Sequence, residues 1–151
     1  MLKGIHPLIS PPLLAALAQM GHGDEIAIVD GNFPARSVAA REPIRLDGAS
    51  ATEAAAAILT LMPLDRFVAA PVVRMRVEGA GERWEPVHTE LREIAEHAEG
   101  RPISVLDLSR TEFYARAREA YAVVATGETR PYGCFLLAKG VWPELVPEGA
   151  P

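Results

Sequence analysis

Two titratable residues flank a short apolar run near the amino terminus. The segment "GHGDEIAIVDGN" places His22 between two glycines, and Asp30 follows a run rich in isoleucine and valine. An imidazole can give and take protons near neutral pH, and a carboxylate at the end of a buried strand often binds a polar ligand. The pattern predicts proton transfer at His22 and ligand binding at Asp30. The alternative is an ordinary loop histidine and an aspartate that forms a turn before Gly31 and Asn32.

Elements that could position these residues alternate along the chain. Apolar periodicity and capping residues predict helices over 10–21, about 52–62, 85–100 and 109–120. The first helix is expected to end at Gly21, just before His22. Runs rich in branched apolar residues predict strands over 25–30, 70–79, 102–108, 121–126 and 134–140. The strand at 102–108 is expected to be buried, and the last two strands are expected to be neighbours joined by the turn at 127–133.

This order of elements predicts an α/β fold. We expect a single three-layer domain over residues 1–141, with a central, mostly parallel sheet and helices on both faces. The proline-rich segment 142–151 is expected to be an irregular tail. Ligands of such folds usually bind at the carboxyl ends of the strands, where Asp30 is expected to lie.

Composition narrows the classes of function. The chain has 151 residues and a formal net charge of −5, so a general affinity for nucleic acid or for an anionic membrane is not expected. Its single cysteine cannot form an intrachain disulfide, and no long apolar run indicates a signal or a membrane span. We therefore expect a cytoplasmic protein. The spacing of His6, His88 and His97 does not match a metal site, and no nucleotide-binding fingerprint is present.

Two long segments resemble one known family. The segment "LKGIHPLISPPLLAALAQMGHGDEIAIVDGNFPARS" is similar to the amino-terminal signature of the fucose mutarotases and ribose pyranases, and most similar to the fucose branch. The segment "FYARAREAYAVVATGETRPYGCFLLAKG" resembles the "FYxxA", "TGE" and "YGNxxLKKG" segments of that family in the same order. The resemblance covers nearly the whole chain and is weakest over residues 78–104.

The resemblance implies an activity and a site. It implies an enzyme that interconverts the anomers of a free monosaccharide, L-fucose or a related sugar, without metal or cofactor. It also implies a homodecamer or another ring-like homo-oligomer, with each site completed across a subunit boundary. His22 would be the proton donor and Asp30 would bind sugar hydroxyls. Arg110 and the triplet Tyr132, Gly133 and Cys134 would contribute to sugar binding.

Two of these residues have alternative interpretations. Arg110 could equally be a solvated residue in the first turn of a helix. Cys134 stands where the family commonly has asparagine, so a strong hydrogen-bonding group is replaced by a weak one. This replacement leaves the identity of the sugar open, and a buried cysteine acts by default as a small hydrophobic residue.

The interconversion of sugar anomers requires chemistry that His22 can perform. Ring opening of a cyclic sugar needs only proton transfer and positioning, and acid-base catalysis by one group contributes about 10²- to 10⁴-fold in rate. Two alternatives remain: a ribose-type pyranase that interconverts pyranose and furanose forms, and a non-catalytic sugar-binding regulatory protein. The intact "MGHGDE" segment favours an enzyme, because a binding protein does not need a proton-transfer group at His22.

Overall fold

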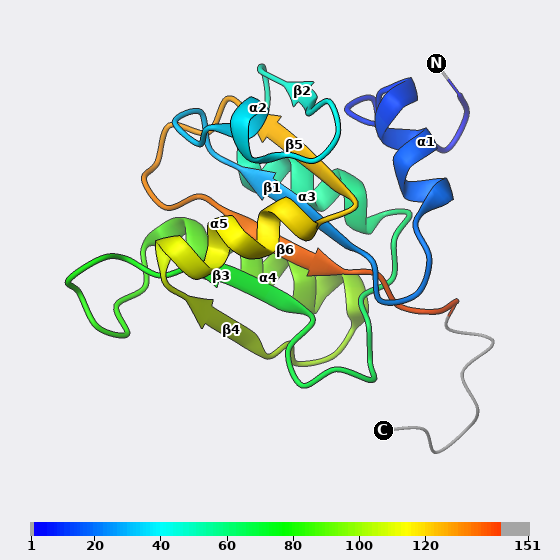
Figure 1. Cartoon of the computed structure of the whole chain (residues 1–151). Coiled ribbons are helices and arrows are strands. Elements are labelled where there is room, and N and C mark those ends of the chain that lie inside the picture. Colours follow the sequence, from blue (N-terminus) through cyan, green and yellow to red (C-terminus); the bar gives the residue numbers. More distant parts are fainter. Residues whose placement is uncertain (1, 143–151) are drawn as a thin grey trace.

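A six-stranded sheet with helices on both faces forms the core of the computed structural model (Figure 1). The structure describes residues 2–142. The irregular tail expected over 142–151 lies outside the described residues, apart from Trp142.

The sheet has the strand order β2-β5-β1-β6-β3-β4. The strands are β1 (Glu25–Val29), β2 (Ile44–Leu46), β3 (Val72–Met75), β4 (Val105–Leu108), β5 (Ala122–Thr126) and β6 (Phe135–Ala138). Strand β6 lies between β1 and β3 and is antiparallel to both, whereas the pairs β1/β5, β2/β5 and β3/β4 are parallel. The expected mostly parallel sheet is confirmed.

The helices pack on the two faces of the sheet and form two separate apolar clusters. They are α1 (Pro11–Gln19), α2 (Ala35–Val38), α3 (Ala51–Leu59), α4 (Pro86–Glu99) and α5 (Arg110–Glu119). One cluster joins α1, α3 and α4 to side chains such as Ile26 and Leu137. The other joins α2 and α5 to Ala27 and Leu136, which point to the opposite face because side chains alternate along a strand. The three-layer α/β fold is therefore confirmed (Figure 1).

Local capping explains where α3 and α5 begin. Ser50 and Ser109 each accept a hydrogen bond from the backbone three residues later, and Glu53 and Glu112 bond back to them. Both capping boxes were predicted from the sequence and are confirmed. The end of α1 differs from the prediction, because the helix stops at Gln19 and its cap is the extended residue Met20 rather than Gly21.

Two other predictions of the sheet were wrong, and two short elements were missed. Strands β5 and β6 are not neighbours, because the connection 127–134 crosses the end of β1 and places that strand between them. Strand β4 is an edge strand rather than a buried one, and Leu106 on it is 41% exposed. The short elements α2 and β2 were not predicted, since four and three residues are too few to show a periodic pattern.

Candidate functional site

His22 lies in a tight turn at the amino-terminal end of β1. The carboxylate of Asp24 accepts a hydrogen bond from the Gly21 amide at 2.7 Å, and Gly23 has a φ of +84° that favours glycine. The amide of Gly23 donates to the Lys139 carbonyl at 2.8 Å, which ties the turn to the end of β6. The turn therefore presents the imidazole to solvent, with 46% of the His22 side chain exposed.

The ammonium group of Lys139 occupies the end of the preceding helix. Its Nζ donates to the carbonyls of Leu17 and Met20 at 2.8 and 2.6 Å. This cation therefore binds carbonyls at the end of α1, and His22 lies beyond the cap residue Met20. The expected position of His22 directly after the helix is thus corrected.

A buried aspartate binds the imidazole. Asp65 Oδ1 lies 3.1 Å from His22 Nε2, and the Asp65 side chain is only 2% exposed. The same oxygen accepts the Phe67 amide at 2.9 Å, and the Phe67 ring meets the His22 ring edge to face at 5.6 Å between centroids. Since the carboxylate accepts at Nε2, the other ring nitrogen, Nδ1, is left for proton exchange with a ligand. Asp65 was not predicted from the sequence.

The second part of the candidate site lies at the carboxyl end of β1. Asp30 is 7% exposed, and its Oδ1 accepts the Asn32 amide at 3.0 Å. A cavity of about 330 Å³ opens beside it. The residues that line this cavity are Asp30, Asn32, Phe33, Met75, Arg110, Tyr114, Pro131 and Tyr132. The structure therefore brings three sequence-predicted site residues, Asp30, Arg110 and Tyr132, around one cavity.

Helix α5 contributes two side chains to this cavity. Arg110 Nε pairs with Glu78 Oε1 at 3.2 Å, and both side chains are more than half exposed, so the interpretation as a solvated residue keeps its basis. Tyr114, one helical turn later, was not predicted, although its spacing from Arg110 places both on one face. Burial raises the pKa of the Tyr114 phenol, which therefore stays a hydrogen-bond donor at neutral pH.

The triplet Tyr132, Gly133 and Cys134 follows a loop. Among the described residues Tyr132 is the one non-glycine residue with a positive φ, +61°. A Cβ at Gly133 would lie 2.7 Å from Glu128 Cγ, so only glycine fits there without a shift. Cys134 is fully buried, and its Sγ accepts the Asp30 amide at 3.5 Å. Burial raises the pKa of this thiol, and its side chain does not line the cavity, so it contacts the site through Asp30.

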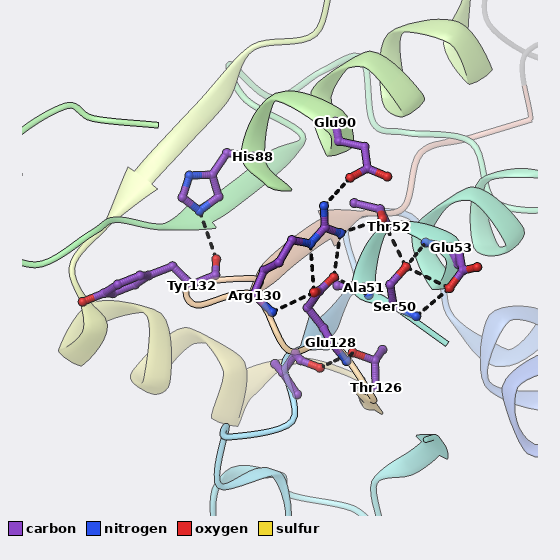
Figure 2. Close-up of polar contacts among 11 residues, drawn as sticks. Ser50, Ala51, Thr52, Glu53, His88, Glu90, Thr126, Glu128, Arg130 and Tyr132 are labelled. Carbon is purple, nitrogen blue, oxygen red and sulfur yellow. Dashed lines mark hydrogen bonds and ion pairs between the residues drawn. The ribbon is translucent and has the colours of Figure 1, made fainter. Parts of the chain in front are cut away.

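Ion pairs fix the loop that carries this triplet (Figure 2). Arg130 donates from Nε and Nη2 to the two carboxylate oxygens of Glu128 at 2.9 and 2.8 Å. Glu128, 3% exposed, also accepts the Ala51 amide at the start of α3, and Arg130 donates to Glu90 on α4. The bonds from Arg130 hold the pKa of the Glu128 carboxyl below its usual range. The loop is thus anchored to two helices.

His22 and Asp30 lie at opposite ends of β1 in one chain. The five residues of this strand span about 13 Å at a rise of about 3.3 Å per residue. This distance exceeds the length of one pyranose ring. A single chain therefore does not bring the imidazole to the cavity beside Asp30.

Residues 2–142 contain neither a cluster of metal ligands nor a membrane-spanning helix. No three side chains of His, Cys, Asp or Glu in this range gather closely enough to hold a metal ion. None of its helices is long and apolar enough to cross a membrane.

A family model, named relatives and a solved structure all match nearly the full length of the chain. Residues 3–142 match the model of the RbsD / FucU transport protein family. The human fucose mutarotase is 48% identical over 145 residues, which cover 93% of this chain and 94% of that protein. The L-fucose mutarotase of Haemophilus influenzae is 44% identical over 146 residues, covering 96% of this chain and 100% of that protein. A crystal structure of the Streptococcus pneumoniae fucose mutarotase in complex with L-fucose superposes with a TM-score of 0.86 at 41% identity, covering 93% of this chain and 99% of that one.

Proposed function

Because the chain belongs to the RbsD / FucU transport protein family, we propose that it is a monosaccharide mutarotase acting on L-fucose or a related sugar. The observation that carries the proposal is an exposed imidazole bonded to a buried carboxylate, His22 with Asp65, in a chain 48% identical to a fucose mutarotase. An exposed histidine with an oriented ring is equipped for proton transfer.

The reaction consists of two proton transfers and one bond change. The anomeric hydroxyl loses its proton, the ring oxygen gains one, and the bond between the anomeric carbon and the ring oxygen breaks to give the open aldehyde. Closure on the other face of the carbonyl reverses these steps. In this proposal protonated His22 donates its Nδ1 proton to the ring oxygen, Asp65 stabilises the protonated imidazole through Nε2, and a solvent water takes the proton of the anomeric hydroxyl. On closure the neutral imidazole takes its proton back from the former ring oxygen. These steps change no oxidation state, and proton transfer is sufficient for them, so the proposal includes neither metal nor cofactor.

The cavity beside Asp30 supplies the binding groups of the proposal. The carboxylate of Asp30 accepts hydrogen bonds from sugar hydroxyls, and Arg110 and the Tyr114 phenol donate them. The Tyr132 ring covers an apolar face of the sugar. Gly133 and Cys134 shape this wall from behind, Gly133 by its close approach to Glu128 and Cys134 by its bond to the Asp30 amide.

We further propose that each site is composed of two copies of the chain. The support is the placement of His22 and Asp30 at opposite ends of β1, which one sugar cannot bridge. Phe67 and Val68, next to Asp65, are 48% and 44% exposed and form an apolar border beside the imidazole that a second copy could cover. A homodecamer or another ring-like homo-oligomer in the cytoplasm fits this arrangement. A monomer in light scattering at micromolar concentration would contradict it.

The direct test is magnetisation transfer between the anomeric proton signals of an equilibrated sugar. Spectra of fucose, ribose and galactose are recorded with and without the protein and with the His22→Gln variant. We expect faster exchange of fucose or a related sugar with the protein, and a loss of about 10²-fold or more in the variant. Exchange only between ribose pyranose and furanose forms would indicate a pyranase, and binding without exchange a regulatory sugar-binding protein.

A further inference from the structure

Tyr132 adopts a backbone conformation that a side chain normally avoids. Its φ of +61° lies in the left-handed region, which is unfavourable for a bulky residue and is retained only where the surroundings impose it. The Tyr132 carbonyl accepts a hydrogen bond from His88 Nε2 at 3.0 Å, and His88 is 1% exposed at the start of α4 (Figure 2). This bond joins the cavity wall to a helix 44 residues away in the chain.

The neighbours of His88 determine which ring nitrogen carries the proton. Nδ1 receives the Glu85 amide at 3.0 Å and Arg74 Nη1 at 3.0 Å. Both of these groups can only donate, so Nδ1 must be the unprotonated acceptor. The proton is therefore on Nε2, where it points to the Tyr132 carbonyl. Burial lowers the pKa of His88, which agrees with a neutral ring holding a single proton.

The side chains around His88 keep its ring in place. Arg74 is fully buried, donates to Asp107 from Nε at 2.7 Å and to the Arg83 carbonyl at 3.0 Å, and its guanidinium lies over the Trp84 ring. The His88 ring itself meets the rings of Trp84 and Phe135 edge to face. The donor to Tyr132 is therefore held by groups on β3, β4 and β6 as well as by its own helix.

We propose that His88 is a positioning residue, whose Nε2 proton holds the Tyr132 peptide in the left-handed conformation and so sets the Tyr132 ring at the sugar cavity. That the cavity binds a sugar rests on the proposed function. The effect of His88 on the Tyr132 backbone does not depend on that function. A purely structural His88 would stabilise the contact between β3 and α4 without affecting Tyr132.

Two substitutions separate these roles. His88→Gln keeps an amide donor near the position of Nε2, whereas His88→Asn keeps an acceptor near Nδ1 and loses the donor to Tyr132. We expect His88→Asn to raise the KM for the sugar about tenfold with a smaller change in kcat, and His88→Gln to restore KM to within about threefold, as expected for loss and rescue of one hydrogen bond. Equal KM values in folded His88→Asn and wild-type protein would overturn the proposal.

A second readout does not depend on any sugar. Crystal structures of the two variants report the Tyr132 backbone directly. We expect a positive φ in His88→Gln and a changed φ or a displaced ring in His88→Asn, and an unchanged Tyr132 in His88→Asn would overturn the proposal even if no sugar were a substrate. If neither variant folds, nitrogen NMR of histidine-labelled wild-type protein decides the case. A proton on Nε2 supports the proposal, and a proton on Nδ1 contradicts it.

Discussion

Replacing Asp65 with asparagine should slow sugar exchange about fivefold. The Asp65 carboxylate lies 3.1 Å from His22 Nε2, and the side chain is 2% exposed, so its charge is available to the imidazole. A hydrogen bond to a charged group contributes about 1.5–3 kcal/mol and a neutral one about 0.5–1.5 kcal/mol. The difference is about 1–1.5 kcal/mol, and His22 is half exposed, so the lower end applies. Since about 1.4 kcal/mol corresponds to a factor of ten in rate, about 1 kcal/mol corresponds to a factor of about five.

Magnetisation transfer between the fucose anomers measures this effect, with Asp47→Asn as the matched control. Asp47 pairs with Arg45 on the surface, and its side chain is 63% exposed, so exchange should not change in that variant. Because Asp65 acts through His22, the double variant with His22→Gln should be no slower than His22→Gln alone. Multiplied losses in the double variant, or full activity of Asp65→Asn, would refute the assignment.

Three further predictions concern the loop and its supports. Gly133→Ala should destabilise the protein by about 1–3 kcal/mol in urea unfolding, because its Cβ would overlap Glu128. The control Gly48→Ala, which has open space around it, should change the free energy of unfolding by less than about 0.5 kcal/mol. Equal changes in the two variants would exclude the overlap. Cys134→Asn should change sugar affinity or preference through its contact with the Asp30 amide, and unchanged kinetics on fucose, ribose and galactose would show that Cys134 does not influence the site. Burial holds the pKa of His88 below its ordinary value of 6.5, so on acidification the unfolded chain binds this proton before the folded protein does. The free energy of unfolding should therefore fall as the pH drops below about 6.5, and it should fall less in His88→Gln.

Local patterns predicted the helices and most strands because their causes are local. Ser50 and Ser109 lie three residues before the glutamates that complete their capping boxes, and this spacing is visible in the sequence. The placement of β6 was not predictable in the same way. A fully buried strand reads as an apolar run whichever neighbours it has, and the order of strands depends on how the connection at 127–134 crosses the sheet.

In the candidate site, too, residues with a local sequence signal were predicted, and residues that meet only through the fold were not. Asp30, Arg110 and Tyr132 were predicted, and they meet at one cavity. Asp30 directly follows β1 and Arg110 begins α5 shortly after β4, so both lie at the carboxyl ends of strands. Asp65 was missed, since it lies 43 residues from His22 and no periodic pattern connects the two. The sequence shows His88 only as one of three histidines whose spacing does not match a metal site, and its contact with Tyr132 depends on distant parts of the chain.

Subunit complementation tests the central claim most directly, namely that His22 of one copy acts at the Asp30 cavity of another. Two inactive variants, His22→Gln and Asp30→Asn, are unfolded together in equal amounts and refolded, and sugar exchange is measured. If each site takes its two residues from different chains, about a quarter of the sites in a random mixture contain both, and exchange should recover to about a quarter of the wild-type rate. Exchange that stays at the level of the separate variants would contradict the composite site.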